Sequence, residues 1–317
     1  MNTTSNSTRF NHDLIIPETL SGWRVDAAIA NLLPQYSRAR LCSWIKSGEI
    51  RINSAVLKPK DKIIGGERVS IIAEIVGSIA YIPESMDLNI VYEDEALIIV
   101  NKQTGIVSHP AAGNWTGTLV NGLLYHCNDL AKLPRAGLVH RLDKDTTGLM
   151  VVAKTLTAHA YLVEQLQLRN IKRCYETIVN GTMIAGGTVD APIGRHEKSR
   201  QKMAVNTKNG KPAVTHYRVK KRFEAHTHLD VQLETGRTHQ IRVHMDHINY
   251  PIVGDQLYAG RRRFPKGCTP ALRDMIESFG RQALHARSLG FIHPLTQEEC
   301  LWEAPLPADM QALLKAL

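Results

Sequence analysis

The sequence predicts an α+β protein with two domains. Its 317 residues are enough for two hydrophobic cores, because a single core seldom grows beyond this size. Short apolar strands and helices are mixed along most of the chain. Residues that break secondary structure gather near residue 80, and they separate a small N-terminal part from a larger remainder.

The N-terminal segment is expected to be a mobile, disordered tail. Residues 1–12 begin with MNTTSNST and contain few apolar side chains. Without apolar burial, nothing offsets the conformational entropy that ordering this segment would cost. We therefore exclude it from the predicted fold.

Two short helices are predicted in the small domain, which we place at residues 13–76. Apolar residues recur at helical spacing from Val25 onwards, and Pro34 ends that pattern. Ser37 is a suitable N-cap for a second helix, and Gly48 is a suitable end for it. The two helices should pack on each other through their apolar stripes.

The remainder of the small domain is expected to contain two short strands and a basic surface. The strands are predicted at residues 50–53 and 69–73. On the second helix, Arg38, Arg40 and Lys46 lie off the apolar stripe, so their charges should face solvent. The sequence thus predicts a small basic module of about 60 residues.

The larger domain is placed at residues 84–317, after a linker at residues 77–83 that contains Gly77, Ser78 and Pro83. Its short apolar runs, bounded by turn residues, are typical of strands. The clearest predicted elements are strands at residues 97–100, 149–153, 174–179 and 229–233 and a helix at residues 157–169.

The charge balance favours a polyanionic partner. Lys and Arg total 39 against 30 Asp and Glu, which gives a formal net charge of +9 and a pI near 9.3. Such a charge attracts nucleic acid, with an affinity that falls as the salt concentration rises. A merely solvated basic surface has the same composition, so the motifs must decide between the two interpretations.

The cysteines and the N-terminus indicate a reducing compartment. The five cysteines are odd in number and widely spaced, and no two form a C-x-x-C pair. The N-terminus is polar, so no secretory signal is predicted, and no apolar run is long enough to cross a membrane. We therefore expect a cytoplasmic protein without a membrane partner.

A polar turn directly before an apolar strand is the most informative segment. It runs from His140 to Lys154 and reads HRLDKDTTGLMVVAK. The carboxylates of Asp143 and Asp145 can cap backbone N–H groups of the turn. Alternatively, one of them acts on a substrate at the margin of the strand.

The same segment also fits a phosphatase pattern. Asp143 to Thr147 reads D-x-D-x-T, as in phosphatases of the haloacid dehalogenase type, whose first Asp attacks phosphorus beside Mg²⁺. Against this interpretation, His140 and Arg141 precede the acids where a buried strand is expected. The Gly254-Asp255 pair also lacks the second acid that would complete a magnesium site. The phosphatase remains the alternative enzyme class.

A second segment, ETGRTHQIRVHM, begins at Glu234 and presents Arg237, His239 and Arg242 after a Thr-Gly turn. Its histidines could suggest zinc, but H-E-x-x-H is absent and the cysteines are dispersed. The neighbouring guanidinium groups would repel a divalent cation. An anionic partner fits this segment better than a metal.

A third segment places Tyr175 in a strand just after Lys172 and Arg173. A tyrosine in a strand is usually half-buried packing. Taken alone, this residue would not indicate function.

Along the chain these segments follow one another as HRLDKDTTG, the Tyr175 strand and TGRTHQIRVH, and in this order they resemble the RluA family of pseudouridine synthases. The likeness extends through HPAAGN before the first segment and GDQLYAG after the second, and it covers nearly all of residues 84–317. Residues 23–73 resemble an S4 RNA-binding domain of the αL type. The resemblance implies a central mixed, largely antiparallel sheet with flanking helices and a catalytic cleft.

The resemblance also implies a role for individual residues. Asp143 matches the catalytic aspartate, Tyr175 the active-site tyrosine and Arg242 the basic partner of the aspartate. Arg141 matches the arginine that fills the gap left by a flipped nucleotide, and Ile241 matches an apolar residue of the uracil pocket. Further substrate-binding residues are His140, Arg237 and His239, and the implied RNA-binding residues of the S4 domain are Arg38, Arg40, Lys46 and Arg51.

The implied reaction is the isomerisation of uridine to pseudouridine in RNA. It needs no oxidation or hydrolysis, so no cofactor and no metal are expected. Within the family the likeness is greatest to members that act on 23S ribosomal RNA at the helix 69 stem-loop, through PRAGLVHRLDKDTTGLMVVAKT and GKPAVTHYRV. Such an enzyme would aid maturation of the large ribosomal subunit, act on 23S RNA or a precursor particle, and work as a monomer.

Two alternatives remain beside the phosphatase. Related family members modify other uridines of the same 23S RNA, and the two domains alone do not distinguish them. A non-catalytic S4 ribosome-assembly factor with an inert second domain is the alternative from outside enzymes. The complete set of Asp143, Tyr175 and Arg242 argues against that factor.

Overall fold

The structure is a computed structural model that describes residues 7–33, 36, 38–76, 82–111, 113–199, 201–259 and 263–317. The chain divides into two compact units, Met1–Ala80 and Tyr81–Leu317. This boundary falls in the segment predicted as a linker. Residues 77–81 of that segment lie outside the described residues, as do Pro34 and Ser37 at the predicted helix junction.

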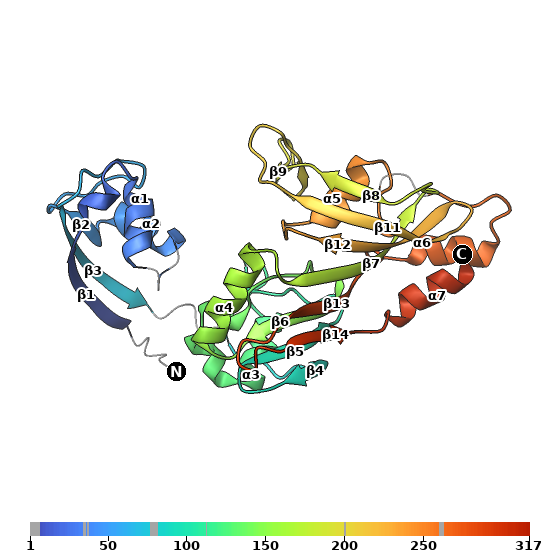
Figure 1. The fold of residues 1–317 in the computed structure, drawn as a ribbon, viewed down its shortest axis with the longest axis horizontal. Coiled ribbons are helices and arrows are strands. Elements are labelled where there is room, and N and C mark those ends of the chain that lie inside the picture. The colour runs from blue at the N-terminus through green and yellow to red at the C-terminus, as the bar shows by residue number, and fades with distance from the viewer. Residues whose placement is uncertain are drawn as a thin grey trace. The chain divides into compact units, whose positions relative to one another are not determined.

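The N-terminal unit packs two helices on a three-stranded antiparallel sheet in the order β1-β3-β2 (Figure 1). Its buried core gathers the apolar stripes of both helices and alternate residues of the strands. The predicted helices and strands are confirmed. The elements are β1 (Ser7–Ile15), η1 (Glu18–Leu20), α1 (Val25–Leu32), α2 (Arg38–Ser47), β2 (Ile50–Ile52) and β3 (Arg68–Val76).

The prediction of a mobile tail at residues 1–12 is wrong for residues 7–12. These residues belong to β1, which pairs with β3 over its whole length, from Ser7 opposite Val76 to Ile15 opposite Arg68. The segment is ordered by backbone hydrogen bonds to a neighbouring strand, which its polar composition did not indicate. Residues 1–6 lie outside the described residues.

The C-terminal unit is built on a nine-stranded sheet with helices packed against it. Its strands run in the order β4-β5-β6-β13-β7-β12-β11-β8, with β14 paired to β13. The strands are β4 (Ile90–Glu93), β5 (Leu97–Lys102), β6 (Thr147–Ala153), β7 (Lys172–Asn180), β8 (Gly187–Asp190), β11 (Val214–Arg222), β12 (His226–Leu233), β13 (Leu284–Ile292) and β14 (Glu299–Glu303). The helices are α3 (Leu119–His126), η2 (Asn128–Lys132), η3 (Pro134–Gly137), α4 (Leu156–Gln167), α5 (Gln240–His247), α6 (Pro270–Ser278) and α7 (Ala308–Ala316).

The sheet is mixed and largely antiparallel, as predicted, because β6 and β13 form its one parallel pair among the described strands. Ala286 of β13 pairs with Gly148 of β6 on one side and with Tyr175 of β7 on the other. The beginning of β6 therefore lies two strands away from Tyr175. β9 (Ile193–Arg195) and β10 (Met203–Val205) pair as a separate two-stranded antiparallel sheet.

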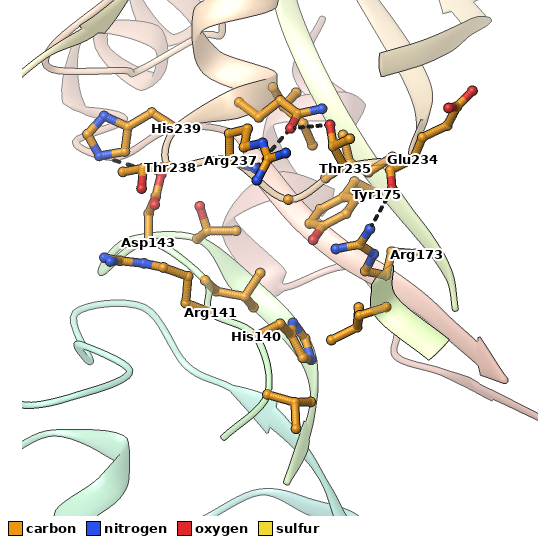
Figure 2. Close-up of a pocket in the computed structure, with 18 of the residues that line it drawn as sticks. His140, Arg141, Asp143, Arg173, Tyr175, Glu234, Thr235, Arg237, Thr238 and His239 are labelled. Carbon is orange, nitrogen blue, oxygen red and sulfur yellow. Dashed lines mark hydrogen bonds and ion pairs between the residues drawn. The ribbon is translucent and has the colours of Figure 1, made fainter. Parts of the chain in front are cut away.

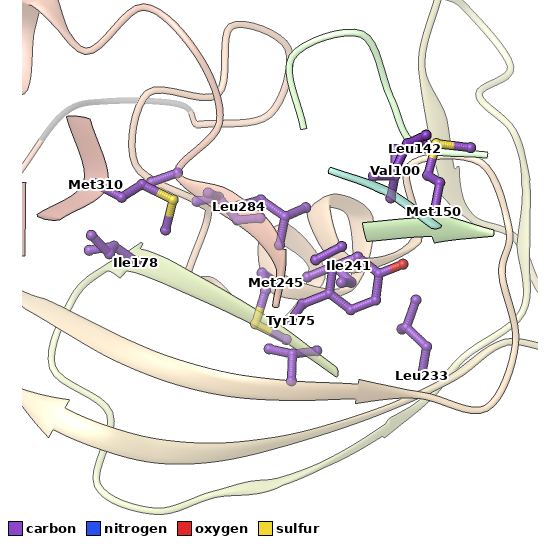
Figure 3. Packing of buried hydrophobic residues seen from close by; sticks show 14 of the residues in the cluster. Val100, Leu142, Met150, Tyr175, Ile178, Leu233, Ile241, Met245, Leu284 and Met310 are labelled. Carbon is purple, nitrogen blue, oxygen red and sulfur yellow. The ribbon is translucent and has the colours of Figure 1, made fainter. Parts of the chain in front are cut away.

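Both faces of the central strands are covered. On β6, Met150 and Val152 join the core cluster that contains residues of α3, α5 and α7, whereas Leu149 and Val151 join the cluster under α4. Every residue of β6 is buried, which explains why these strands read as continuous apolar runs in the sequence. Figure 3 shows the first of these clusters reaching Tyr175.

Gly148 is required where β6 begins. Its φ angle is +114°, a value that side chains rarely tolerate, and a Cβ there would lie 2.3 Å from the carbonyl oxygen of Ala286. The turn from Asp143 to Thr147 can enter the sheet at this point because the residue that follows has no side chain.

The buried side chain of Lys102 holds the same turn in place through hydrogen bonds. Its side chain is 2% exposed, and its Nζ donates hydrogen bonds to the carbonyl oxygens of Gln103, Ile106 and Lys144 at 2.8, 3.0 and 2.9 Å. Lys144 lies between the two aspartates of the turn. The buried side chain of Lys102 thus joins the end of β5 to the segment that leads into β6.

We expect Lys102→Met to lower the free energy of unfolding of the C-terminal unit by about 1–3 kcal/mol, because it leaves three carbonyl oxygens without the donor that they share. Urea denaturation followed by circular dichroism measures this change. Lys132→Met is the control, since Lys132 pairs with Asp129 on the surface, where both side chains are more than 70% exposed. Equal effects of the two substitutions would contradict the role of Lys102.

Candidate active site

A pocket of about 530 Å³ opens in the C-terminal unit, which is within the usual size range for a ligand site. Most of its lining comes from the turn before β6, the first half of β7, the turn from β12 into α5 and the C-terminal end of α4 (Figure 2). The structure brings all eight predicted active-site and substrate-binding residues together here, namely His140, Arg141, Asp143, Tyr175, Arg237, His239, Ile241 and Arg242.

Asp143 forms an ion pair with Arg242 at the centre of these segments. Nη1 of Arg242 donates to Oδ2 of Asp143 at 2.9 Å, and the two side chains are 7% and 15% exposed. Asp145 is not among the residues that line the pocket, and its carbonyl oxygen accepts a hydrogen bond from Arg281 instead. Of the two aspartates in the turn, Asp143 is therefore the one placed to meet a ligand.

Asp255, which was not predicted as a site residue, binds the Nε and Nη2 atoms of Arg242. Its carboxylate accepts from Nε and Nη2 of Arg242 at 2.6 and 2.9 Å. Its Oδ1 also accepts the backbone N–H groups of Leu257 and Tyr258. The only signal for this role in the sequence was the acid in the GDQLYAG stretch.

Both carboxylates stabilise the positive charge of Arg242. Burial disfavours the charged guanidinium, but the hydrogen bonds and charges of Asp255 and Asp143 outweigh burial and raise the pKa of Arg242 above its ordinary value. The fork geometry of the Asp255 contact fixes the plane of the guanidinium. Nη1 is then left to orient the carboxylate of Asp143.

His239 lies beside this pair in a left-handed conformation, with a φ angle of +58°, as the N-cap of α5. Its Nδ1 is hydrogen-bonded to the Tyr258 hydroxyl at 2.8 Å, and its Nε2 lies 3.9 Å from Oδ2 of Asp143. Burial lowers the pKa of His239, so the ring is neutral at pH 7. Arg242 packs over the Tyr258 ring at 5.0 Å.

Tyr175 and Ile241 form the apolar wall of the pocket. They are 6% and 3% exposed and belong to the core cluster of the sheet, together with Leu142 and Leu284, which also line the pocket (Figure 3). Burial raises the pKa of Tyr175, so its phenol remains protonated. This wall suits the flat face of an aromatic ring or a base.

The remaining predicted residues lie around the wall. Arg141 is exposed, and Nε of Arg237 donates to the carbonyl oxygen of Pro212 at 3.1 Å. Nε2 of His140 accepts the N–H of Val151, and burial together with the charge of Arg173 lowers the pKa of His140 to about 3. His140 therefore contributes a neutral ring.

The predicted RNA-binding residues of the N-terminal unit lie on α2 and β2. Lys46 and Arg51 are exposed, and Arg40 is half-buried. Nη2 of Arg38 donates to Asp26 at 3.0 Å, so part of its charge is already balanced. Asp26 also binds Arg24, and it was not identified in the sequence.

Across the described ranges, no group of three or more His, Cys, Asp or Glu side chains could hold a metal ion. His244, one of the histidines considered for zinc, is instead bonded to Thr215 and to the carbonyl oxygen of Ala191. None of the helices in the described part of the chain is long and apolar enough to cross a membrane.

Comparison with known proteins shows the family. Residues 96–247 match the family model described as RNA pseudouridylate synthase. The chain is 54% identical over 302 residues to Ribosomal large subunit pseudouridine synthase D of Pseudomonas aeruginosa, which covers 95% of this chain and 94% of that protein. The protein of the same name from Escherichia coli K12 is 52% identical over 303 residues, with 95% and 93% coverage.

A solved structure has the same fold. Human RNA Pseudouridylate Synthase Domain Containing 4 superposes with a TM-score of 0.54 at 27% identity, covering 72% of this chain and 92% of that one. The match to the curated relatives covers nearly the whole chain. The chain belongs to the RluA family of RNA pseudouridine synthases.

Proposed function

We propose that this protein isomerises uridine to pseudouridine in 23S ribosomal RNA, at the helix 69 stem-loop, with Asp143 as its catalytic group. The observation that carries the proposal is the Asp143 carboxylate, oriented by Arg242 at one side of a pocket whose wall is apolar. The names of the relatives support ribosomal RNA of the large subunit as the substrate. The likeness to helix 69 enzymes supports the position within that RNA.

The reaction breaks the N-glycosidic bond, turns the uracil and rejoins it to the sugar through carbon 5. Asp143 acts in one of two ways: it attacks carbon 1′ of the ribose, or it removes the proton from carbon 2′. Arg242 serves either route, because it supplies the counter-charge and holds the carboxylate in one orientation.

The pocket must keep the detached uracil in place and keep water from the sugar. Tyr175 and Ile241 form a dry surface on which the base can lie and turn. A paired base cannot reach this surface, so the uridine must flip out of its helix at a cost of a few kcal/mol, which a stem-loop lowers. Arg141, exposed beside the pocket, can stack in the gap that the uridine leaves.

The wider setting follows from this function. The substrate is 23S RNA or a precursor of the large subunit, the protein acts as a monomer in the cytoplasm, and the N-terminal unit is an S4 domain that binds RNA. Membership of the family argues against the phosphatase and against a non-catalytic assembly factor.

Mapping of pseudouridines in ribosomal RNA, from cells with and without this gene, tests the target. Loss of the helix 69 pseudouridines supports the proposal. Loss of pseudouridines elsewhere in 23S RNA would assign the protein to the other large-subunit enzymes of the family. An unchanged map would refute the function.

Asp143→Asn should abolish pseudouridine formation and leave RNA affinity within a few fold, because the amide keeps the shape but is a poor nucleophile and a poor base. Single-turnover conversion of a stem-loop RNA and filter binding measure the two effects. Asp145→Asn is the matched control and should retain at least partial activity, since its side chain does not line the pocket. Near-normal turnover by the Asp143 variant would exclude this residue as the catalyst.

Arg242→Met should reduce turnover far more than Arg237→Met. The first substitution removes the shared counter-charge of Asp143 and Asp255, whereas Arg237 contacts a backbone carbonyl. Breaking a buried pair costs about 3–5 kcal/mol, so thermal unfolding of both variants must be recorded with the kinetics. Equal losses of activity in two folded variants would show that the ion pair is not what matters.

Lys46→Gln combined with Arg51→Gln should weaken binding to 23S RNA and flatten its salt dependence. For each phosphate that the double variant no longer binds, the slope of log affinity against log salt should become shallower by roughly 0.7–0.9. Conversion of a short stem-loop should be affected less, because the N-terminal unit would add a tethered second contact only on large RNA. Lys132→Gln combined with Lys315→Gln removes the same charge from the C-terminal unit, and an identical effect on the slope there would contradict the S4 assignment.

A further inference from the structure

Arg173 is a buried cation that forms no ion pair within the part of the chain that the structure describes. It lies on β7 two residues before Tyr175, and 6% of it is exposed. Its Nη2 donates to the carbonyl oxygen of Glu234 at 3.2 Å, but its Nε is buried without a hydrogen-bond partner. The Glu234 carboxylate is engaged elsewhere, with Arg169 and His216.

The guanidinium of Arg173 faces the pocket. It lines the cavity with Tyr175, and Figure 2 shows it beside the Tyr175 hydroxyl, on the side away from Asp143. The turn at Gly236 closes over it, and a Cβ at that position would lie 2.7 Å from Nη1. The lack of a side chain at 236 thus leaves room for the group at the edge of the pocket.

A buried charge without a partner destabilises a folded protein by several kcal/mol. Such a group is typically retained where a ligand supplies the opposite charge. Two carboxylates are among the residues that line the pocket, but Asp143 is paired with Arg242 and Glu234 with Arg169 and His216, so neither is bonded to Arg173. The missing anion must therefore come from the substrate.

The proposed reaction produces an anion at this place. When the glycosidic bond breaks, N1 of uracil keeps the bonding electron pair, and the negative charge spreads to O2 and O4. The charge persists until carbon 5 bonds to carbon 1′, after which carbon 5 loses its proton. This holds whether Asp143 attacks carbon 1′ or removes the 2′ proton, since uracil leaves with the electron pair in both routes.

We propose that Arg173 is a further catalytic residue, which binds the detached uracil through a carbonyl oxygen and stabilises its negative charge while the ring turns. This inference rests on the proposed function. It gives the pocket two charged sides, with Asp143 at the sugar and Arg173 at the base, and the Tyr175 ring between them. Because the guanidinium is buried and already in place, its field acts on the anion without much reorganisation.

Single-turnover kinetics of Arg173→Gln on a stem-loop RNA test the proposal. We expect the rate to fall by about 10²- to 10³-fold, as when a preorganised donor to a developing anion is removed. RNA affinity and its salt dependence should not change. Arg173→Lys keeps the charge and should recover at least about tenfold of the lost rate. Lys172→Gln is the matched control: it is the adjacent residue of β7, on the opposite face of the strand, 64% exposed and paired with Glu299.

A substrate containing 5-fluorouridine separates charge stabilisation from packing. Fluorine at carbon 5 withdraws electrons and stabilises the uracil anion, so the loss in rate caused by Arg173→Gln should shrink by about tenfold or more when disappearance of the 5-fluorouridine is followed. An equal loss on both substrates would show that Arg173 acts only by packing. A salt slope reduced by roughly 0.7–0.9 would show that it binds a phosphate.

The two proposals can fail separately. If the wild-type protein forms no pseudouridine in any RNA tested, the proposed function itself is wrong. If the wild-type protein is active and Arg173→Gln, shown to be folded by its thermal transition, is equally active, then only the role of Arg173 is refuted.

Discussion

The arrangement of the active site depends on one buried row of charges, Asp143–Arg242–Asp255. Arg242 is 7% exposed and lies between the two carboxylates, so removing it would leave the fully buried carboxylate of Asp255 without a counter-charge. The three residues come from the turn before β6, from α5 and from the loop after α5. A single arginine therefore fixes the turn before β6 relative to α5 and the loop that follows α5, although Asp143 and Arg242 are 99 residues apart in the sequence.

The conformation of the surrounding backbone brings Asp143 and Arg242 together. Gly148 lets the turn that carries Asp143 enter the sheet against Ala286, and Lys102 holds the carbonyl oxygen of Lys144 from beneath. On the other side, His239 takes a left-handed conformation as the N-cap of α5, which begins at Gln240 and so carries Arg242 in its first turn. The backbone conformations of Gly148 and His239 are unusual, and unusual backbone conformations are typical of functional sites.

The strands around the pocket were easier to predict than its functional residues, since the place of Tyr175 and Ile241 in the wall came only from the family resemblance. Tyr175 and Ile241 belong to a core whose strands are buried on both faces, and such strands are visible in the sequence as apolar runs. Asp143 and Arg242 are 99 residues apart, and no spacing rule connects them, so their pairing could be predicted only from the family resemblance. Asp255 was missed because an acid after a glycine is usually a turn residue. The strand at Ser7–Ile15 was missed because its order depends on pairing with β3, which composition does not record.

The three buried basic side chains, Arg242, Lys102 and Arg173, have different partners and therefore different tasks. Arg242 is neutralised by two carboxylates, so its task is geometric, and it adds little net field to the base. Lys102 donates to three carbonyl oxygens and serves the backbone. Arg173 forms one hydrogen bond to a carbonyl oxygen and no ion pair among the described residues, so its field extends into the cavity. A uracil lying on Tyr175 would thus have a carboxylate beside its sugar and an uncompensated positive charge beside its ring. When the glycosidic bond breaks, the bonding electrons move from the sugar to the ring, so they would move away from the carboxylate and towards the positive charge.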